Sequence, residues 1–248
     1  MKRGWPLVAL GIGAFIIFAL FTLPARLALG WFAPPQLNTA GVSGTVWNGR
    51  AQVVQFGDAP LGGAEWDLHV LPLFTGRLSA DVRLKRVDGS AQTRLTASPG
   101  GTVRFEQLAG SLPMSALPAG VVPGGWTGTV NLKLDELSLD HGWPVRAAGT
   151  IEVRDVTGPA RQPVNRGSYK IALPAQKSPP GTLAGDLSDI GGPLQVTGTL
   201  QLKPDRSYLI EGLIAPRPDA PSDVVNTLQF LGAADAQGRR PFSLAGTL

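Results

Sequence analysis

GTVNLKLDELSL, residues 128–139, alternates apolar and polar side chains with a period of two. Successive side chains of a strand point to opposite faces of a sheet, so this pattern predicts a strand with one apolar face. The alternation slips once, at Asp135-Glu136, where we expect a bulge or a bend. An antiparallel sheet that buries one of its faces is the structure that this stretch indicates.

The same alternation recurs on both sides of this stretch, in residues 78–87, 149–156, 192–205 and 206–217. Gly and Pro contribute 32 and 22 of the 248 residues, and they gather between these segments as turns require. The predicted fold is mainly β: a twisted antiparallel sheet of about 12 strands with one or two short helices. The helices are expected within 223–231 and, as a single turn, within 112–120.

An uncharged apolar run stands near the N-terminus, between Lys2-Arg3 and Arg26. About 20 apolar residues in a helix cover the ~30 Å hydrocarbon core of a bilayer. The run therefore predicts a transmembrane helix over 5–25, and the basic residues ahead of it predict a cytoplasmic N-terminus over 1–4. Trp5 and Trp31 are expected at the two membrane interfaces, with Arg26 closing the run.

Two other interpretations of this run are weaker. A cleaved signal peptide has a shorter apolar core and small residues at its cleavage site, whereas this run is followed by Leu23 and Pro24. A buried core helix is disfavoured by the length of the run and by its lack of a polar face. We expect an uncleaved anchor, a linker over 26–40 and an exported β-rich domain over 41–248.

The composition excludes several classes of function. The chain has no cysteine, so disulfide bonds, thiol chemistry and Cys-ligated zinc are all ruled out. The formal net charge is +4, but the basic residues are spread out or flank the apolar run. A nucleic-acid-binding protein would show basic clusters interleaved with aromatic residues, and none is present. We therefore predict no nucleic-acid partner and no cofactor.

Candidate catalytic residues are few, and each has a simpler structural interpretation. The two histidines, His69 and His141, lie in a strand-like segment and in a turn, with no second histidine at metal-ligand spacing. A serine hydrolase of the Gly-x-Ser-x-Gly type is excluded because that motif is absent. Two carboxylate pairs, Asp135-Glu136 and Asp186/Asp189, are most simply turn formers. The sequence predicts no catalytic residue, no metal site and no enzyme activity.

Tryptophans beside glycine or proline are the more informative residues. Trp47, Trp126 and Trp143 lie at predicted strand ends, where an indole ring can pack under a turn. The same rings could line a groove for acyl chains or for a partner strand. With Arg239 and Arg240 they are our candidate interface or groove residues, although a structural role is the simpler interpretation of each.

Several segments together resemble the type II secretion system protein N family. They are the basic start with an apolar run ending in LPAR at 23–26, GVSGTVWNGRA at 41–51, WDLHVLPLFTG at 66–76, GWTG at 125–128 and GGPL at 191–194. The most distinctive is LQFLGAADAQGRRPFSLAGT at 228–247. The resemblance extends over most of the chain and keeps the order of the segments.

This resemblance implies an inner-membrane component of a machine that moves folded proteins from the periplasm across the outer membrane. It implies an accessory or assembly scaffold acting through protein–protein interactions, without catalytic residues. The expected partners are other inner-membrane proteins of the secretion system, the pseudopilus or the secretin. The β-rich domain would then be periplasmic, and its sheet edges could bind partners by strand addition.

A second interpretation remains open, because the pattern is also similar to AsmA-like proteins, whose curved sheets hold lipids. The apolar residues of the strands would then face phospholipid acyl chains instead of a closed core; they include Leu132, Leu134, Val196, Leu200 and Leu202. Burial of apolar surface is worth ~25 cal/mol/Å² whichever partner covers it, so the sequence does not choose between the two.

Overall fold

The computed structural model describes residues 5–117, 125–159, 164–174 and 182–247. The helices in these ranges are α1 (Trp5–Phe21), α2 (Ala25–Phe32) and α3 (Ser222–Leu228), with short 3-10 helices η1 (Leu71–Thr75), η2 (Met114–Ala116) and η3 (Gln229–Leu231). Within these ranges, none of the helices combines the length and the apolar character needed to cross a membrane.

In the described ranges, fourteen strands make up one sheet. The first seven are β1 (Leu37–Ala40), β2 (Ser43–Gly44), β3 (Asn48–Phe56), β4 (Ala59–His69), β5 (Leu78–Lys85), β6 (Ser90–Ala97) and β7 (Thr102–Pro113). The others are β8 (Thr127–Asp140), β9 (Trp143–Thr157), β10 (Asn165–Leu173), β11 (Leu183–Gly191), β12 (Leu194–Leu202), β13 (Ser207–Pro216) and β14 (Arg240–Thr247).

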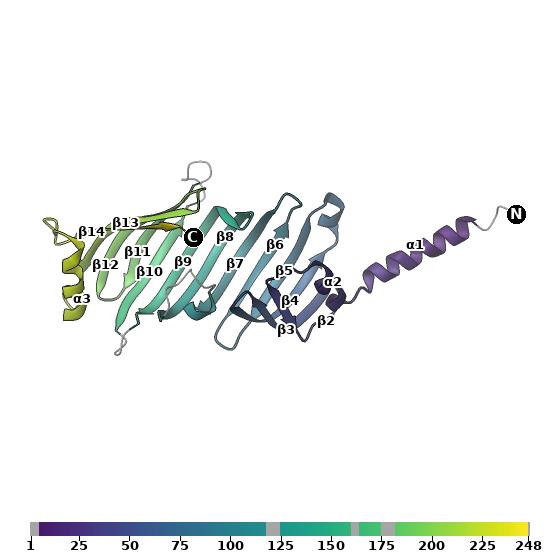
Figure 1. The fold of residues 1–248 in the computed structure, drawn as a ribbon, viewed down its shortest axis with the longest axis horizontal. Helices are drawn as coiled ribbons and strands as arrows, with labels where there is room; N and C mark the ends of the chain where they lie inside the picture. Colours follow the sequence, from purple (N-terminus) through teal and green to yellow (C-terminus); the bar gives the residue numbers. More distant parts are fainter. Residues whose placement is uncertain (1–4, 118–124, 160–163, 175–181, 248) are drawn as a thin grey trace.

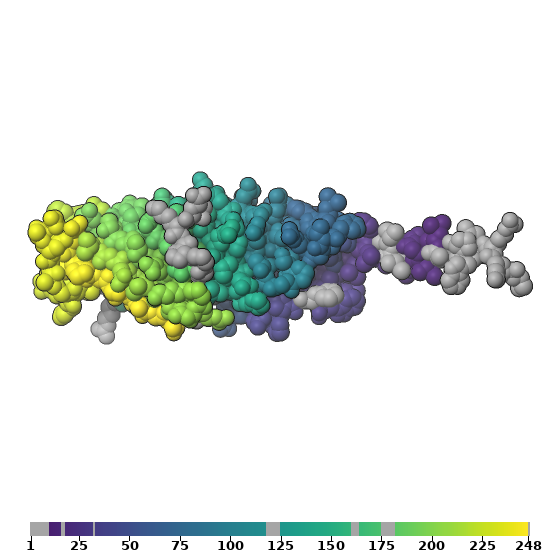
Figure 2. Space-filling view, turned by 90° about the horizontal axis from the view of Figure 1, so that it is seen from above, coloured from purple at the N-terminus to yellow at the C-terminus, as the bar shows by residue number. Residues whose placement is uncertain are grey.

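The sheet is a meander in which neighbours in sequence are neighbours in space. The order is β1-β3-β4 and then each strand in turn to β14, and every neighbouring pair is antiparallel. Figure 1 shows the strands side by side along the long axis, with α1 projecting from one end and α3 at the other. Figure 2 shows the same body as a long, narrow slab.

The predicted mainly β, antiparallel fold is thus confirmed, but the strand count of about 12 was too low. The difference includes two short strands near the N-terminus. β1 and β2 pair with the same edge of β3, β1 through Val53–Phe56 and β2 through Gly49 and Arg50. Strands of four and two residues are too short to show a clear alternation in the sequence.

The two faces of the sheet differ in polarity because the period of two is kept from strand to strand. Leu132, Ile151 and Ile171 lie opposite one another in register on β8, β9 and β10, so they share one face. Asn131 and Glu152, one position along, share the other face. We call the first the apolar face and the second the polar face.

Burial on the apolar face is concentrated in small clusters. At the C-terminal end, Val224 and Leu228 of α3 pack against Leu194 and Val196 of β12, and Val224 is only 2% exposed. Nearer the N-terminus, Ala116 of η2 packs with Ala91 and Leu112, and the Leu134 cluster lies between these two regions. Most other apolar side chains in the central strands are half-buried.

The predicted bulge at Asp135-Glu136 is confirmed. The pairing of β8 with β9 shifts register between Leu134 and Glu136. Opposite the shift, Gly149 has a φ of +128°, and a Cβ there would lie 2.3 Å from the carbonyl oxygen of Lys133. Only glycine fits this close approach of two strands.

The predicted helices are also found, with changed details. The segment 223–231 forms α3 followed by η3, and Gly232 ends it with a φ of +94°. The N-cap of α3 is Pro221, so Ser222 is the first helical residue and makes no side-chain cap. The turn within 112–120 is η2, and the later residues of that segment lie outside the described ranges.

The apolar run and the segment after it contain more structure than the predicted boundaries imply. α1 ends at Phe21 and α2 begins at Ala25, so a helix occupies part of the segment predicted as a linker. β1 begins at Leu37, within the same segment. Whether 5–25 acts as a membrane anchor and 41–248 as one domain stays a prediction.

Candidate interaction surfaces

Trp47 joins α1 to the sheet. Its indole Nε1 donates a hydrogen bond to the carbonyl of Leu20 at 2.8 Å, and its ring lies 5.8 Å from that of Phe21 between centroids. Next to it, the amide of Val46 donates to the carbonyl of Leu23 at 3.0 Å. These contacts tie the last turn of α1 to the start of β3, so Trp47 holds two elements together, as the structural interpretation expects.

Trp66 on β4 supports this junction from the neighbouring strand. Its Nε1 donates to the carbonyl of Val46 at 3.1 Å, and its ring covers Gly49, where an added Cβ would lie 2.4 Å from the ring. Glycine leaves a gap in a strand that an aromatic side chain on the next strand can fill. The VWNG segment at 46–49 is therefore held in place by two tryptophans.

The other two candidate tryptophans lie apart from Trp47 and from each other. Trp126 is half-buried beside Gly158, in the segments that flank β8 and β9. Trp143 begins β9 and pairs with Asp140 across a tight turn. Its Nε1 is buried without a hydrogen-bond partner. The sheet places the three rings at different strand ends, and an interface or groove role for them stays a prediction.

Arg239 precedes β14 and Arg240 is its first residue; the side chains of both bond to the loop before the strand. Arg239 forms an ion pair with Asp235 at 2.9 Å, and its amide donates to the same carboxylate. Backbone and side-chain donors of Arg239 lower the pKa of the Asp235 carboxyl. Arg240 donates to the carbonyl of Gly232. The contacts of both arginines are those of loop-forming residues, and an interface role for them stays a prediction.

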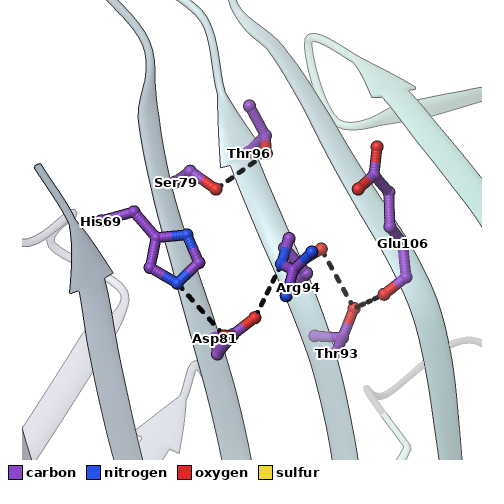
Figure 3. A network of polar contacts seen from close by, with 7 residues as sticks. All are labelled: His69, Ser79, Asp81, Thr93, Arg94, Thr96 and Glu106. Atoms are coloured by element: carbon purple, nitrogen blue, oxygen red, sulfur yellow. Dashed lines mark hydrogen bonds and ion pairs between the residues drawn. The ribbon is translucent and has the colours of Figure 1, made fainter. Parts of the chain in front are cut away.

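A chain of polar contacts crosses the polar face over β4, β5, β6 and β7 (Figure 3). His69 Nε2 lies 3.1 Å from Asp81 Oδ2, and Arg94 Nε donates to the other oxygen of Asp81 at 2.9 Å. The hydrogen bond and charge of Arg94 lower the pKa of the Asp81 carboxyl. Ser79 accepts a hydrogen bond from Thr96 at 3.2 Å in the next row.

This network holds strands together and is poorly arranged for catalysis. The Asp81 carboxylate that orients His69 is shared with Arg94, which neutralises it. Ser79 lies opposite His69 in register, but its hydroxyl is hydrogen-bonded to Thr96 instead of to the imidazole. Among the described residues, no group of three or more His, Asp or Glu side chains is placed to hold a metal ion. His69 thus forms a cross-strand pair, in line with its structural interpretation.

The sheet separates the two carboxylates of the Asp186/Asp189 pair. Asp186 and Asp189 lie on opposite faces of β11, because they are three residues apart in a strand. Asp189 is nearly buried on the apolar face, where it accepts from Arg217 and from the amide of Val196. These contacts tie the start of β12 and the residue after β13 to the end of β11.

Exposed apolar side chains gather on the helical segments at the N-terminal end of the sheet. On α1 they include Leu10, Phe15, Phe18 and Phe21; on α2 they are Leu27 and Trp31; on η1 they are Leu71, Leu73 and Phe74. The structure thus places Trp31 and Arg26 together on α2, and the side chain of Trp5 is not among those described. The sequence prediction missed η1, although an apolar LPLF at 71–74 shortly before Gly76 was its signal.

The edges of the sheet differ as binding surfaces. β14 is an unbroken edge strand of eight residues whose partners on β13 run in register from Ser207 to Ile214. After Arg240 and Pro241 it carries no charged side chain, and Leu244 is 55% exposed. The opposite edge is made of β1 and β2, with Gly41 at a positive φ between them.

These features define a class of protein: an open, single-sheet β meander carried on an exposed apolar helix. Comparison with known proteins gives the family. The family model described as "Type II secretion system (T2SS), protein N" matches residues 35–243. The chain belongs to the type II secretion system protein N family, as its resemblance to that family indicated.

Similar proteins match over nearly their whole length. The type II secretion system protein N of Aeromonas hydrophila is 27% identical over 259 residues, with all of both chains covered. That of Vibrio cholerae is 28% identical over 269 residues, again with full coverage. That of Pectobacterium carotovorum is 26% identical, with 97% of each chain covered. No solved structure matches the chain.

Proposed function

We propose that this type II secretion component is a non-catalytic assembly scaffold of the inner membrane. In this proposal α1 holds it in the membrane, its sheet lies in the periplasm, and the edge of β14 binds other secretion proteins. Those partners are other inner-membrane components, the pseudopilus or the secretin. The family relationship supports a place in the secretion system.

The observation that carries the docking part is the open edge of β14. Natural sheets protect their edges with charges, prolines, bulges or a covering element, because unpaired backbone groups otherwise accept another strand. Beyond Pro241, the sequence FSLAGT at 242–247 has none of these side chains, and Ser243, Leu244 and Ala245 are exposed. A partner strand added here would gain main-chain hydrogen bonds and continue both faces of the sheet.

Membrane attachment is supported by the surface of α1. Its 17 residues contain no charged side chain, and Leu10, Phe15 and Phe18 are exposed. Apolar side chains gathered on a projecting helix require a lipid or protein environment. The positive residues Lys2 and Arg3 ahead of it favour a cytoplasmic N-terminus.

The edge is tested by placing lysines on it. The double variant Ser243→Lys/Ala245→Lys introduces charges at exposed positions, and the matched control Asn38→Lys/Ala40→Lys does the same on β1. Each full-length variant is expressed in a deletion strain of a host that secretes by this system. We expect the β14 variant to abolish exoprotein release at normal protein levels, while the β1 variant restores it. Normal release by the β14 variant contradicts docking through this edge.

The partner and the membrane attachment are tested separately. A photo-cross-linking residue at Leu244 is expected to capture secretion proteins, which mass spectrometry then identifies, whereas the same residue at Asn38 captures none. For α1, Ile12→Arg/Phe15→Arg is expected to remove the protein from the membrane fraction, because arginine is costly in hydrocarbon. The control Ile12→Leu/Phe15→Leu should stay there.

A second function, phospholipid binding along the apolar face, is favoured by one observation. Leu132, Ile151, Ile171 and Leu187 form a row across four strands and are only half-buried. A photoactivatable phospholipid in the full-length protein tests this. Labelled peptides from β8 and β10, lost in Leu132→Glu/Ile171→Glu, would support lipid binding. Labelling confined to the N-terminal helices would contradict it.

A further inference from the structure

The 3-10 helix η1 presents its largest side chains to the outside. Leu71 is 80% exposed and Phe74 is 84% exposed, and Leu78 just after it is also exposed. Single exposed apolar residues are common on proteins, but a cluster of large ones marks a contact with a membrane or a partner. The hydrophobic clusters of the described part contain neither Leu71 nor Phe74.

The position of η1 places this cluster next to the base of α1. β4 ends at His69, and near that end the amide of Leu68 donates to the carbonyl of Trp47 at 2.6 Å. Trp47 in turn holds the last turn of α1 through Leu20 and Phe21. η1 therefore starts three residues after a residue that is bonded to the α1 junction.

α2 adds a second exposed apolar surface at the same end of the molecule. It follows α1 after three residues, and Pro24 just before it forms a β-bridge with Thr45. One side of α2 buries Ala25, while Leu27 and Trp31 are exposed, the latter by 67%. Trp side chains and amphipathic helices of this kind favour the interface between a bilayer and water.

The charges around these side chains suit a lipid surface. Arg26 is the second residue of α2, beside Leu27, and Arg77 follows η1; both are exposed. Basic side chains flanking apolar ones pair with anionic head groups while the apolar groups enter the acyl boundary. A protein partner could bind the apolar side chains alone. It would not require basic residues beside them, nor a position next to α1, whose own apolar side chains are exposed.

We propose that η1 and α2 form a membrane foot, made of Leu27, Trp31, Leu71 and Phe74 with Arg26 and Arg77, that dips into the bilayer surface. The proposal rests on the proposed attachment by α1 and deepens it. The occupant of this surface is the bilayer that holds α1. Together with the Trp47 junction, the foot fixes how the sheet stands on the membrane, so that β14 lies at the end away from it (Figure 1).

The absence of cysteine makes a site-specific test direct. The variants Phe74→Cys, Leu10→Cys and Val87→Cys are labelled with an environment-sensitive fluorophore in the full-length protein. Val87 is the matched control, because it is a fully exposed apolar residue at the other end of β5 from η1. The proteins are reconstituted in phosphatidylethanolamine/phosphatidylglycerol vesicles with or without a quencher-bearing phospholipid.

We expect the probe at 74 to shift its emission to the blue and to be quenched at least about twofold more than the probe at 87. The probe at 10 should be quenched as well. Quenching at 10 with equal, weak quenching at 74 and 87 overturns the foot and leaves attachment by α1 intact. No quenching at 10 overturns the attachment, and the foot with it. Protection of Phe74→Cys from a thiol reagent in cells, without quenching in vesicles, identifies a protein partner and also overturns the foot.

Discussion

The two ends of the sheet are stabilised by different kinds of contact. At the N-terminal end the edge is divided between β1 and β2, and hydrogen bonds of Val46, Trp47 and Trp66 tie it to α1. At the C-terminal end α3 packs on the apolar face, while β14 leaves an uninterrupted edge. One end is thus fixed by polar and aromatic contacts along its edge. The other is fixed by apolar packing on its face.

This difference separates attachment from docking. An edge strand that is broken and bonded to a preceding helix offers little backbone for a partner, whereas a continuous edge offers a full strand. α3 stabilises the last strands from the face, so the edge of β14 stays open without loss of local stability. The comparison predicts that damage to the C-terminal end costs stability through its core and costs function through its edge.

The largest effect is expected in the core under α3. Leu228→Ala removes a buried side chain that packs with Leu194 and Val196 and should lower the free energy of unfolding by about 2–5 kcal/mol. The exposed neighbour Asn226 provides the control, since Asn226→Ala should change it little. Urea denaturation of the full-length protein in detergent measures both. Equal midpoints for the two variants would show that α3 does not stabilise this end.

A smaller effect is expected from Asp189 on the same face. Asp189→Ala removes the partner of Arg217 and leaves the amide of Val196 without its acceptor, at a cost of about 1–3 kcal/mol. The comparable change in the N-terminal half, Asp81→Ala, should cost less because the Asp81–Arg94 pair is more exposed. Urea denaturation ranks the two variants by their loss of stability. A larger loss for Asp81→Ala than for Asp189→Ala would contradict the assignment of the more stabilising pair to the apolar face.

Alanine substitutions at two glycines compare how closely the backbone is packed at the two ends of the sheet. A Cβ at Gly212, in the close contact of β12 with β13, would lie 2.2 Å from the carbonyl oxygen of Thr197, so Gly212→Ala should cost about 1–3 kcal/mol. Gly57, in the turn after β3, has a φ of +56° and open space, so Gly57→Ala should cost about 1 kcal/mol from backbone strain alone. Thermal unfolding distinguishes them.

The smallest effect concerns pH and the Asp81 network. Arg94 lowers the pKa of the Asp81 carboxyl in the folded protein, mainly through its hydrogen bond. A depressed pKa adds stability above the unfolded pKa of about 3.9, and this is lost as pH falls through the folded pKa. Arg94→Gln should therefore lower stability slightly at neutral pH and make no difference in strong acid. A stability difference that persists below the folded pKa would exclude this origin.

Much of the fold follows from local pattern. The alternation in 128–139 marks β8 and its bulge, and similar alternation marks β5, β9, β12 and β13, because each strand shows one polar and one apolar face. The helix at 223–231 was recognisable from its apolar spacing and from Gly232. β1 and β2 were not recognisable, because strands of four and two residues are too short to show an alternation.

The candidate residues were harder to interpret from the sequence. Trp47, Trp126 and Trp143 have similar neighbours in the chain, yet only Trp47 meets α1, since this contact is 27 residues distant in sequence. Arg239 and Arg240 look like a basic pair, but they bond within their own loop. The exposed cluster of η1 gave an apolar signal that a core segment would also give.

The sequence by itself determined most of the longer strands and the C-terminal helix, the division into two faces, the lack of thiol chemistry and the secretion family. These depend on local composition, on a period of two and on residues compared one by one. Only the tertiary structure decided which edge is open, where η1 stands and what Trp47 holds. Those properties depend on contacts between residues far apart in the chain. The free energy of such a contact depends on both segments and on the chain between them, so it cannot be inferred from either segment alone.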